Sequence, residues 1–554
     1  MQEPRRLSVG DISFLYEQGL IRRLRLAGTE VVRMISVPVR DKNWGTLAPT
    51  VLSSSIDETT DRVHIEEVFS VADGKLLADL VFDVRADGFV SANLTFTGKE
   101  NVQTNRAGFT LLHPIARTTG TALTVSHSDG RATQTRFHEH IAPGQPAIDI
   151  TGLAHTVGTV DVSITFEGET FETEDQRNWS DASFKTYCRP LSLPFPYTIA
   201  KGETVTQRIV INLDRKPEST HQGMAATPTQ RIGKPVRLPQ ICLAVEPGWL
   251  TSASLPQDIV PVLRFAGADS WSDEKLRKVA QTHRDVDIEI VIPEGKAAPA
   301  VCETVNACLE RCGLNAGHVI ALPQAYLKSY QPSGPWPAGL SPKACTQAAR
   351  QTFTKARIGL GMLTHFTEFN RRPPDTSLGD YVTFANTAIV HAADDLSVWE
   401  TLETLPHIFT SAKALSGDLP MRLGLVSIGM RSNPYGAALA PNPGHAKIAM
   451  TGDDPRQREP FAAAYAVAAF ALAAQAGVEA ITLAAPSGRL GMMNADGSLL
   501  PIGKALTVLS ALGSDANLMV SEDKVTLSNA TGSVSADVSG HGAVHLSGFG
   551  EGND

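Results

Sequence analysis

Hydrophobic and polar residues alternate along residues 1–220 in short runs that end at Gly, Asn or Asp. Such alternation places one side of a strand in a core and the other in water, and many short strands joined by turn residues are typical of an antiparallel β-sandwich. The expected strands are Glu30–Val39, Arg62–Val71, Lys75–Val84, Gly88–Phe96, Gly108–His113, Ala122–Ser126, Asp161–Glu167 and Val205–Leu213. The pattern therefore predicts an N-terminal antiparallel β-sandwich.

After residue 237 short apolar runs alternate with segments long enough to form helices. The apolar runs, expected to be buried strands, are Ile241–Val245, Ile259–Phe265, Val286–Ile292, His318–Leu322, Arg357–Phe366, Tyr381–Ile389, Met421–Ile428 and Val478–Leu483. The helical segments between them include Ser272–Arg284, Ala300–Arg311, Pro342–Ala356, Leu396–Leu415 and Pro460–Ala476. Eight strands with interleaved helices predict a (β/α)8 TIM barrel over residues 237–512.

Two further segments complete the division of the chain. Pro217–Pro239 is polar and rich in Pro, Gln and Thr, so we expect a linker there. Asn517–Leu546 alternates again, which predicts a short C-terminal β segment, either as a small unit or against the sandwich. The expected fold class is α/β plus all-β, with domains at 1–220, 237–512 and 513–554.

Composition narrows the class of partner. The chain has 554 residues, of which 42% are hydrophobic and 19% charged, as in folded globular proteins. Lys and Arg number 49 against 58 Asp and Glu, which gives a net charge of −9. A mildly acidic chain without a dense basic tract lacks the electrostatic signature of a nucleic-acid binder. We therefore expect a small-molecule ligand and no nucleic acid.

The sequence also predicts no membrane partner and a cytoplasmic location. Met1–Arg25 contains many charged residues and no apolar run typical of a secretory signal. Phe461–Ala474 is apolar but shorter than the roughly 20 residues that span a bilayer, so we expect a buried helix. The six cysteines form no Cys-x-x-Cys pair, and Cys308 and Cys312 are interpreted as small core residues on one helix face. Both a monomer and a homo-oligomer stay open.

Reactive groups of a TIM barrel lie on the loops that follow the strand C-termini. The fifth strand is expected to continue through His365 to Arg372, and a period of two then puts Phe366, Glu368 and Asn370 on one side. A carboxylate and an amide would thus point together into the barrel mouth. The alternative for Glu368 is a structural salt bridge.

Other strand ends supply further candidates. His391 follows the sixth strand, and Arg431, Asn433 and Tyr435 follow the seventh, whereas Glu246 follows the first. Each has a structural alternative, because a rim histidine is often only hydrogen-bonded and an arginine often only neutralises nearby acids. The pair Asp394-Asp395 precedes a helix, where N-capping is the expected role.

Residues 171–187 combine charges, amides and aromatic rings within the sandwich region. Arg177, Trp179, Asp181 and Lys185 are the candidates that we single out in this segment. A solvated loop rarely carries Trp, Phe and Tyr among so many hydrogen-bonding groups. Aromatic faces beside polar groups suit a polyol ligand or a domain interface, and the two interpretations are compatible.

Several common catalytic motifs are absent from the sequence. It contains no Gly-x-Ser-x-Gly, no glycine-rich phosphate loop and no His-Glu-x-x-His. His138 and His140 lie on one face of an expected strand, but two imidazoles do not make a metal site. We therefore expect neither a metal nor a cofactor.

The chain resembles the D-apionate lactonase family of bacterial branched-sugar catabolism. The matching segments are Arg40–Thr46, His113–Pro114, Glu174–Tyr187, Thr367–Asn370, Ser427–Gly436 and Asp454–Gln457. The resemblance implies a cytoplasmic hydrolase of carbohydrate metabolism that converts D-apionolactone to D-apionate, and kinship with glycoside-hydrolase-like barrels. One departure is Ala485-Pro486-Ser487-Gly488, where relatives tend to have Glu-Thr-Thr-Gly, so the chemistry or the substrate is expected to differ if that Glu takes part.

Opening of a lactone needs an activated water, support for the oxyanion and a proton for the leaving alkoxide. From this chemistry we assign Glu368 as general base and His391 as its partner or as the acid. Arg431 or Asn370 would hold the carbonyl oxygen. The expected sugar contacts are Asn370, Asn433, Tyr435, Arg177, Trp179, Asp181, Lys185 and Glu246.

Three other functions stay open. A glycoside hydrolase would pair Glu368 with Glu246, Asp394 or Asp395, since that reaction needs two carboxylates. A non-catalytic sugar-binding barrel would fit the alanine at position 485. A metal-assisted lactonase would use Glu368, His391 and Asp395 as ligands.

Overall fold

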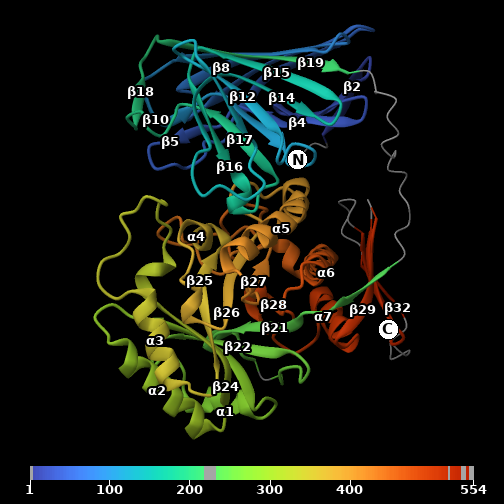
Figure 1. The fold of residues 1–554 in the computed structure, drawn as a ribbon. Coiled ribbons are helices and arrows are strands. Elements are labelled where there is room, and N and C mark those ends of the chain that lie inside the picture. The colour runs from blue at the N-terminus through green and yellow to red at the C-terminus, as the bar shows by residue number, and fades with distance from the viewer. Residues whose placement is uncertain (1–3, 217–232, 252, 522–523, 538–543, 548–554) are drawn as a thin grey trace. The chain divides into compact units, whose positions relative to one another are not determined.

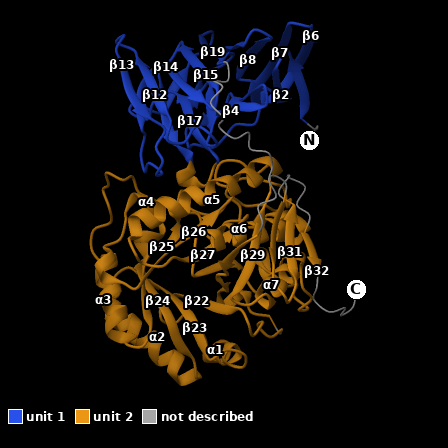
Figure 2. Ribbon diagram, turned by 45° about the vertical axis from the view of Figure 1, so that its right-hand side comes forward, with its two compact units in different colours: residues 1–176, 182–223 blue, residues 177–181, 224–554 orange. Residues whose placement is uncertain are grey.

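The chain divides into two compact units in a computed structural model, coloured separately in Figure 2. Unit 1 comprises residues 1–176 and 182–223, and unit 2 comprises residues 177–181 and 224–554. The structure describes residues 4–216, 233–251, 253–521, 524–537 and 544–547. The segment 177–181 therefore belongs to unit 2, although the residues on either side of it in sequence belong to unit 1.

Unit 1 is an antiparallel β-sandwich, as its alternating pattern predicts. Its strands are β1 (Arg5–Val9), β2 (Ile12–Glu17), β3 (Leu20–Leu26), β4 (Thr29–Ser36), β5 (Val39–Asp41), β6 (Thr50–Glu58), β7 (Arg62–Val71), β8 (Leu76–Arg85), β9 (Phe89–Gly98), β10 (Val102–Ala107), β11 (Thr110–Pro114), β12 (Ala122–His127), β13 (Ala132–Arg136), β14 (Ala147–Val157), β15 (Val160–Glu167), β16 (Phe171–Asp175), β17 (Ser183–Cys188), β18 (Tyr197–Ile199) and β19 (Thr204–Arg215).

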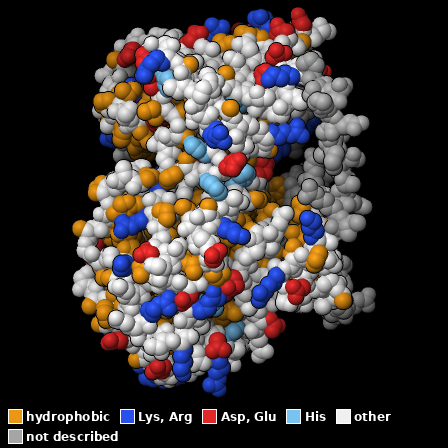
Figure 3. Space-filling model, in the orientation of Figure 1, with side chains coloured by type: hydrophobic (Ala, Val, Ile, Leu, Met, Phe, Trp, Pro, Cys, Tyr) orange, Lys and Arg blue, Asp and Glu red, His pale blue; other side chains and the backbone are white. Residues whose placement is uncertain are grey.

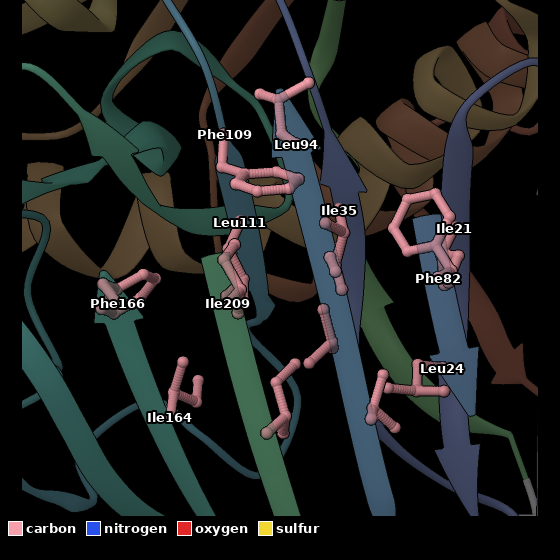
Figure 4. Close-up of a cluster of buried hydrophobic side chains, with 14 of the residues drawn as sticks. Ile21, Leu24, Ile35, Phe82, Leu94, Phe109, Leu111, Ile164, Phe166 and Ile209 are labelled. Atoms are coloured by element: carbon pink, nitrogen blue, oxygen red, sulfur yellow. The ribbon is translucent and has the colours of Figure 1, made fainter. Parts of the chain in front are cut away.

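Most of these strands form one large sheet that folds back on itself. The strand order is β1-β2-β3-β4-β11-β17-β16-β14-β15-β19-β9-β8-β7-β6, with β12 and β13 attached at β14, and a separate small sheet has the order β18-β10-β5. Figure 4 shows the apolar side chains between the layers: Ile21 and Ile35 lie among Phe82, Leu94 and Ile209. Their burial explains why one side of each strand is apolar.

Unit 2 contains the expected closed parallel barrel (Figure 1). Its eight strands are β21 (Gln240–Val245), β22 (Val260–Ala266), β23 (Asp285–Ile292), β24 (Asn315–Pro323), β25 (Arg357–His365), β26 (Tyr381–Thr387), β27 (Arg422–Ser427) and β28 (Ala480–Ala484). Each matches one of the apolar runs, because strands covered on both faces need apolar side chains almost throughout.

Helices surround the barrel. They are α1 (Asp273–Ala280), α2 (Ala298–Cys312), α3 (Pro342–Thr352), α4 (Phe366–Arg371), α5 (Asp395–Ser416), α6 (Pro460–Gln475) and α7 (Pro501–Ala511). The apolar run Phe461–Ala474 lies within α6 and is almost entirely buried, as expected. Asp394 caps α5 by accepting a hydrogen bond from the Ser397 amide at 3.0 Å, which confirms the capping role.

A small antiparallel sheet completes unit 2. It has the order β20 (Lys234–Arg237), β29 (Asp515–Val520), β30 (Lys524–Ser528), β31 (Ser533–Asp537) and β32 (Val544–Ser547). Helices α6 and α7 contact β31 and β32, so the C-terminal strands lie within unit 2. Part of the expected linker is thus a strand, because residues 234–237 pair with β29, whereas residues 217–232 lie outside the described residues.

The structure corrects one local prediction that matters for the site. Strand β25 ends at His365, and the next residues form helix α4 instead of continuing the strand. The cause is a capping box: the Glu368 carboxylate accepts a hydrogen bond from the His365 amide, and the His365 side chain accepts one from the Glu368 amide. Glu368 and Asn370 are therefore neighbours on a helical turn, and the period of two does not apply to them.

Surface features add little to the prediction of partners. Figure 3 shows Lys and Arg side chains of unit 2 interspersed with Asp and Glu on the face in view. Within the described residues, no helix combines the length and apolar character that a bilayer crossing requires. The domain limits at 220, 237 and 512 stay a prediction that limited proteolysis would test.

Candidate active site

The candidate residues collect at the carboxyl ends of the barrel strands. Glu246 directly follows β21, His365 is the last residue of β25, and His391 and Arg431 lie on the loops that follow β26 and β27. Because parallel strands end at the same rim, these four loops meet at one end of the barrel.

Glu368 is buried on α4, with only 1% of the residue exposed. Its Oε2 accepts a hydrogen bond from the His365 amide at 3.0 Å, whereas its Oε1 has no hydrogen-bond partner among the described residues. Burial raises the pKa of Glu368, and the His365 amide and the charge of Arg371 oppose that rise. The carboxyl group is thus prepared to hold a proton at a higher pH than an exposed glutamate does.

A chain of hydrogen bonds connects His365 with the segment 177–181. The Tyr435 hydroxyl lies 3.2 Å from His365 Nδ1 and 2.9 Å from Thr367 Oγ1. Thr367 in turn donates to the Asn178 carbonyl oxygen at 2.7 Å, and Asn370 donates to Asn178 Oδ1 at 3.0 Å. The Asn178 side chain is buried, and its Nδ2 has no partner among the described residues.

Burial also sets the protonation of the groups in this chain. It lowers the pKa of His365 to about 4, so this imidazole is neutral at pH 7. The pKa of the Tyr435 phenol is raised by burial and then by the nearby charge of Glu368. Both side chains therefore act as neutral hydrogen-bond partners beside Glu368.

Asp181 and His391 form a close pair within unit 2. His391 Nδ1 lies 2.6 Å from Asp181 Oδ2, and the two side chains are 26% and 18% exposed. The Trp179 ring meets the His391 ring edge-on with centroids 5.9 Å apart, and the Arg371 guanidinium lies 4.9 Å from the Trp179 centroid. A carboxylate at Nδ1 orients the imidazole and stabilises its protonated form.

Arg431 is held by two carboxylates. Its Nε donates to Glu246 Oε1 and its Nη1 to Glu289 Oε2, both at 2.9 Å. Glu289 lies on β23 inside the barrel, and the same Oε2 accepts from Arg264 Nε at 2.7 Å. Arg431 Nη2 is buried without a partner in the described part of the chain, while Trp249 lies 5.4 Å from the guanidinium.

A second ionic layer lies deeper in the barrel and supports the fold. Arg422 Nη2 donates to Asp287 Oδ2 and Arg422 Nη1 to Glu479 Oε1, each at 2.7 Å. A cavity of about 30 Å³ beside this layer is lined by Asp287, Glu289, Tyr381 and Arg422, with apolar neighbours. Its volume matches a single water molecule, so a sugar does not fit there.

The structure brings most of the predicted residues together in unit 2 and separates one. Lys185 lies on β17 in unit 1, where its Nζ is 3.2 Å from Glu174 Oε2. Arg177 is fully buried and donates to His407 Nδ1 at 3.1 Å, so it holds its segment on α5. Asn433 shapes its own loop, since its Oδ1 accepts from the amides of Tyr435 and Gly436.

Four residues of this site were not among the predicted site residues: Asn178, Arg264, Glu289 and His365. Glu289 left a signal, because Asp287 and Glu289 interrupt the apolar run of β23 at alternate positions, and charges inside a buried strand need partners. His365 ends a strand, where catalytic groups collect, but its capping role has no clear sequence signature. Asn178 and Arg264 gave no comparable signal.

The described residues do not support the metal-assisted alternative. Among them, no group of three or more His, Cys, Asp or Glu side chains is placed to hold a metal ion. Asp395, one of the three suggested ligands, is bound by Lys447 Nζ at 2.7 Å and by Arg456 Nη1 at 3.0 Å. The pair His138 and His140 gains no further ligand.

Position 485 lies in an apolar environment. Ala485 is fully buried after β28 and belongs to a cluster with Ala244, Leu425 and Leu490, against which Trp249 packs. Its amide donates to the Leu490 carbonyl oxygen at 2.8 Å. This chain therefore presents a methyl group, and no carboxylate, at the end of the last barrel strand.

Comparison with known proteins gives matches along nearly the whole chain. Residues 1–216 match the family model described as D-apionate lactonase, N-terminal domain, and residues 255–514 match D-apionate lactonase, TIM barrel domain. A protein from Brucella anthropi named D-apionate lactonase is 36% identical over 514 residues, which cover 89% of this chain and 84% of that protein.

Solved structures are similar at a much lower level. A GH36 α-galactosidase from Geobacillus stearothermophilus is 10% identical with a TM-score of 0.28, covering 96% of this chain and 91% of that one. A GH39 enzyme from Xanthomonas axonopodis is 13% identical with a TM-score of 0.34, covering 55% of this chain and 72% of that one. At these scores neither structure bears on the chemistry.

Proposed function

This chain belongs to the D-apionate lactonase family, and we propose that it is a carboxylic-ester hydrolase that opens a sugar lactone, D-apionolactone, to give D-apionate. The observation that carries the proposal is the Asp181–His391 pair at the carboxyl end of the barrel strands. An imidazole fixed by a carboxylate is suited to accept a proton from water, which is the first requirement of ester hydrolysis.

We assign water activation to His391. Water adds to the lactone carbonyl carbon while the imidazole takes its proton, and Asp181 stabilises the imidazolium that results. General acid–base help of this kind typically contributes roughly 10²–10⁴-fold. His391 is preferred over Glu368 as the base because its side chain is 26% exposed, whereas Glu368 is 1% exposed and has one oxygen engaged by an amide.

Glu368 is assigned to the second half of the reaction. The tetrahedral intermediate collapses by breaking the bond between the carbonyl carbon and the ring oxygen, and the leaving alkoxide needs a proton. A carboxyl group whose pKa is raised by burial can supply that proton near neutral pH. The product carboxylic acid then loses its own proton, and the Glu368 carboxylate regains one from solvent.

Arg431 is assigned to the developing oxyanion. The carboxylates of Glu246 and Glu289 fix the guanidinium, and its buried Nη2 lacks a partner among the described residues. A donor that is fixed before the reaction needs no reorganisation, and such a donor is often worth about 3 kcal/mol. Asn370 is the alternative donor, although its amide already contacts Asn178.

The remaining residues of the site are proposed to bind sugar hydroxyls. Asn178 Nδ2 and Glu368 Oε1 are buried polar atoms without partners in the described residues, and a bound hydroxyl or water would satisfy them. Trp179 offers a ring face, with Tyr435 and Asn433 on the adjoining loop. The mechanism uses neither a metal nor an organic cofactor, so a chelator should leave the rate unchanged.

We also infer a cytoplasmic location. All six cysteines are free and buried, and such thiols are typical of a reducing compartment.

A substrate panel tests the proposed function and its rivals together. The purified chain is assayed by pH-stat on D-apionolactone and other sugar lactones, beside nitrophenyl glycosides measured by absorbance. Opening of D-apionolactone without release of nitrophenol is the expected result. Release of nitrophenol without lactone opening would favour a glycoside hydrolase, and calorimetric binding without any turnover would favour a sugar-binding barrel.

A further inference from the structure

Two arginines face each other across strands of unit 1. In the small sheet β18-β10-β5, Arg40 on β5 is the register partner of Arg106 on β10. Like charges directly opposite each other on antiparallel strands are destabilising. Neither guanidinium has a carboxylate within ion-pair distance among the described residues, so this repulsion is not compensated locally.

Lys185 adds a third cation to this pair. Burial lowers the pKa of Lys185, and the charges of Arg106 and Arg40 lower it further, while Glu174 at 3.2 Å opposes the shift. Burial likewise lowers the pKa of Arg40, with a contribution from Arg106. The three cations are therefore close enough to repel one another.

The local carboxylates are engaged elsewhere. Glu174 accepts from Lys185, and Glu172 accepts from the Tyr187 hydroxyl at 2.5 Å and from the Leu191 amide at 2.9 Å. Asp41 uses Oδ1 to accept from two amides of its own turn, at 2.7 and 2.8 Å. The donors of Arg106 are thus left for another acceptor, and its buried Nε has no partner in the described part of the chain.

Aromatic rings enclose Arg106. Its guanidinium carbon lies 3.8 Å from the centroid of Tyr187 and 5.4 Å from that of Trp44. The Trp44 ring meets Phe195 edge-on at 5.2 Å, and these two residues are 37% and 47% exposed. A cation with unsatisfied donors thus lies beside an exposed aromatic wall.

We propose that Arg40, Arg106 and Lys185, with the wall formed by Trp44 and Phe195, are a binding site for a sugar acid. The guanidinium groups would bind the carboxylate, for which planar paired donors are well matched. The Trp44 ring would cover the apolar C–H face of the sugar. The anion is required by the charges alone, whereas the choice of a sugar acid rests on the proposed function, whose product is one.

The test measures binding of sodium D-apionate, D-gluconate and inorganic phosphate to the full chain by calorimetry at low and high salt. Arg40→Gln and Arg106→Gln are compared with Arg131→Gln, a control at an exposed arginine paired with Asp129. Each cluster variant is expected to weaken sugar-acid binding by at least about tenfold, as loss of a charge-assisted hydrogen bond does. Trp44→Ala is expected to weaken sugar acids and leave phosphate unchanged.

Thermal unfolding of the same variants separates a binding role from a structural one. Arg40→Gln removes a like-charge repulsion, so its melting temperature should stay equal or rise while affinity falls. If Arg106→Gln does not fold, Arg40→Gln alone carries the test.

Undiminished sugar-acid binding in Arg40→Gln overturns the proposal, as does an equal loss in Arg131→Gln. Phosphate binding that matches D-gluconate and ignores Trp44→Ala would reduce the site to one for simple oxyanions and overturn the sugar assignment. Arginine-dependent binding of D-apionate without lactone turnover would end the proposed function and leave this site standing. Turnover without arginine-dependent binding would do the reverse.

Discussion

His391 Nδ1 and Asp181 Oδ2 are 2.6 Å apart, although 210 positions of sequence separate the two residues. Asp181 belongs to the short segment 177–181 that groups with unit 2, and His391 follows barrel strand β26. A segment inserted between two sandwich strands thus supplies the carboxylate that orients a barrel imidazole. The proposed base therefore depends on residues from two distant parts of the chain.

Replacing Asp181 with Asn should lower kcat and change KM little. The amide no longer stabilises the imidazolium, and the expected fall lies within the roughly 10²–10⁴-fold range of general acid–base help. Asp258→Asn, at an exposed loop position of the same unit, serves as the control and should keep wild-type kcat. If the two residues act as one unit, Asp181→Asn combined with His391→Gln should be no slower than His391→Gln alone. Additive losses in kcat would contradict this coupling.

Glu289→Gln should destabilise the barrel strongly. Glu289 Oε2 accepts from Arg264 and from Arg431, and its loss leaves two buried cations without their shared carboxylate. Removing one partner of a buried pair costs about 3–5 kcal/mol, so the free energy of unfolding in urea should fall by about that amount. Glu246→Gln is the comparison, because its side chain is 33% exposed and a smaller loss is expected. Equal losses would show that burial does not set the difference.

The ionised carboxylate of Glu368 is expected to reduce stability. Burial raises its pKa in the folded chain, so stability from this group is full below the ordinary pKa of a glutamate and is lost as the pH rises through the folded value. Glu368→Gln keeps an oxygen for the His365 amide and removes the charge. Relative to wild type, its free energy of unfolding should rise by about 1 kcal/mol or more between acidic and mildly alkaline pH. Glu294→Gln, at an exposed position, should show no such trend.

Much of the barrel could be predicted from the sequence because burial on both faces leaves a plain signal. Strand β23 and helix α6 are apolar nearly throughout, and both lie where the pattern predicted them. The error at Phe366–Arg371 has a local cause, since a capping box that starts from His365 is not a pattern that sequence reasoning recognises. One misjudged helix was enough to change the expected direction of Glu368.

The site itself was predicted less well. Its members were mostly found, because strand ends of a barrel are a short list, but their pairing was not. Arg431 and Glu289 are 142 positions apart, and a residue pattern does not say which distant charges will meet. The grouping of residues 177–181 with unit 2 has no sequence signal that we can identify.

Unit 1 should lose stability in mild acid through His155. Burial lowers the pKa of His155 to about 4, and both ring nitrogens lack partners in the described residues. Below the ordinary histidine pKa the unfolded chain takes up a proton that the folded chain does not, so stability falls as the pH drops toward 4. At pH 5 this amounts to about 2 kcal/mol.

Urea unfolding of His155→Leu at pH 7 and pH 5 checks that value. The variant should lose less stability than wild type over this interval, because the group responsible is gone. His140→Gln, an exposed histidine of the same unit, should follow wild type. A parallel decline in His155→Leu and wild type would mean that other groups cause the acid sensitivity.

The most direct test of the account is the rate at which wild type and His391→Gln open D-apionolactone, followed by pH-stat at neutral pH. The account predicts turnover by wild type and a fall in kcat of at least about 100-fold in the variant, with KM little changed. Wild-type activity in His391→Gln, or no turnover by wild type, would contradict it.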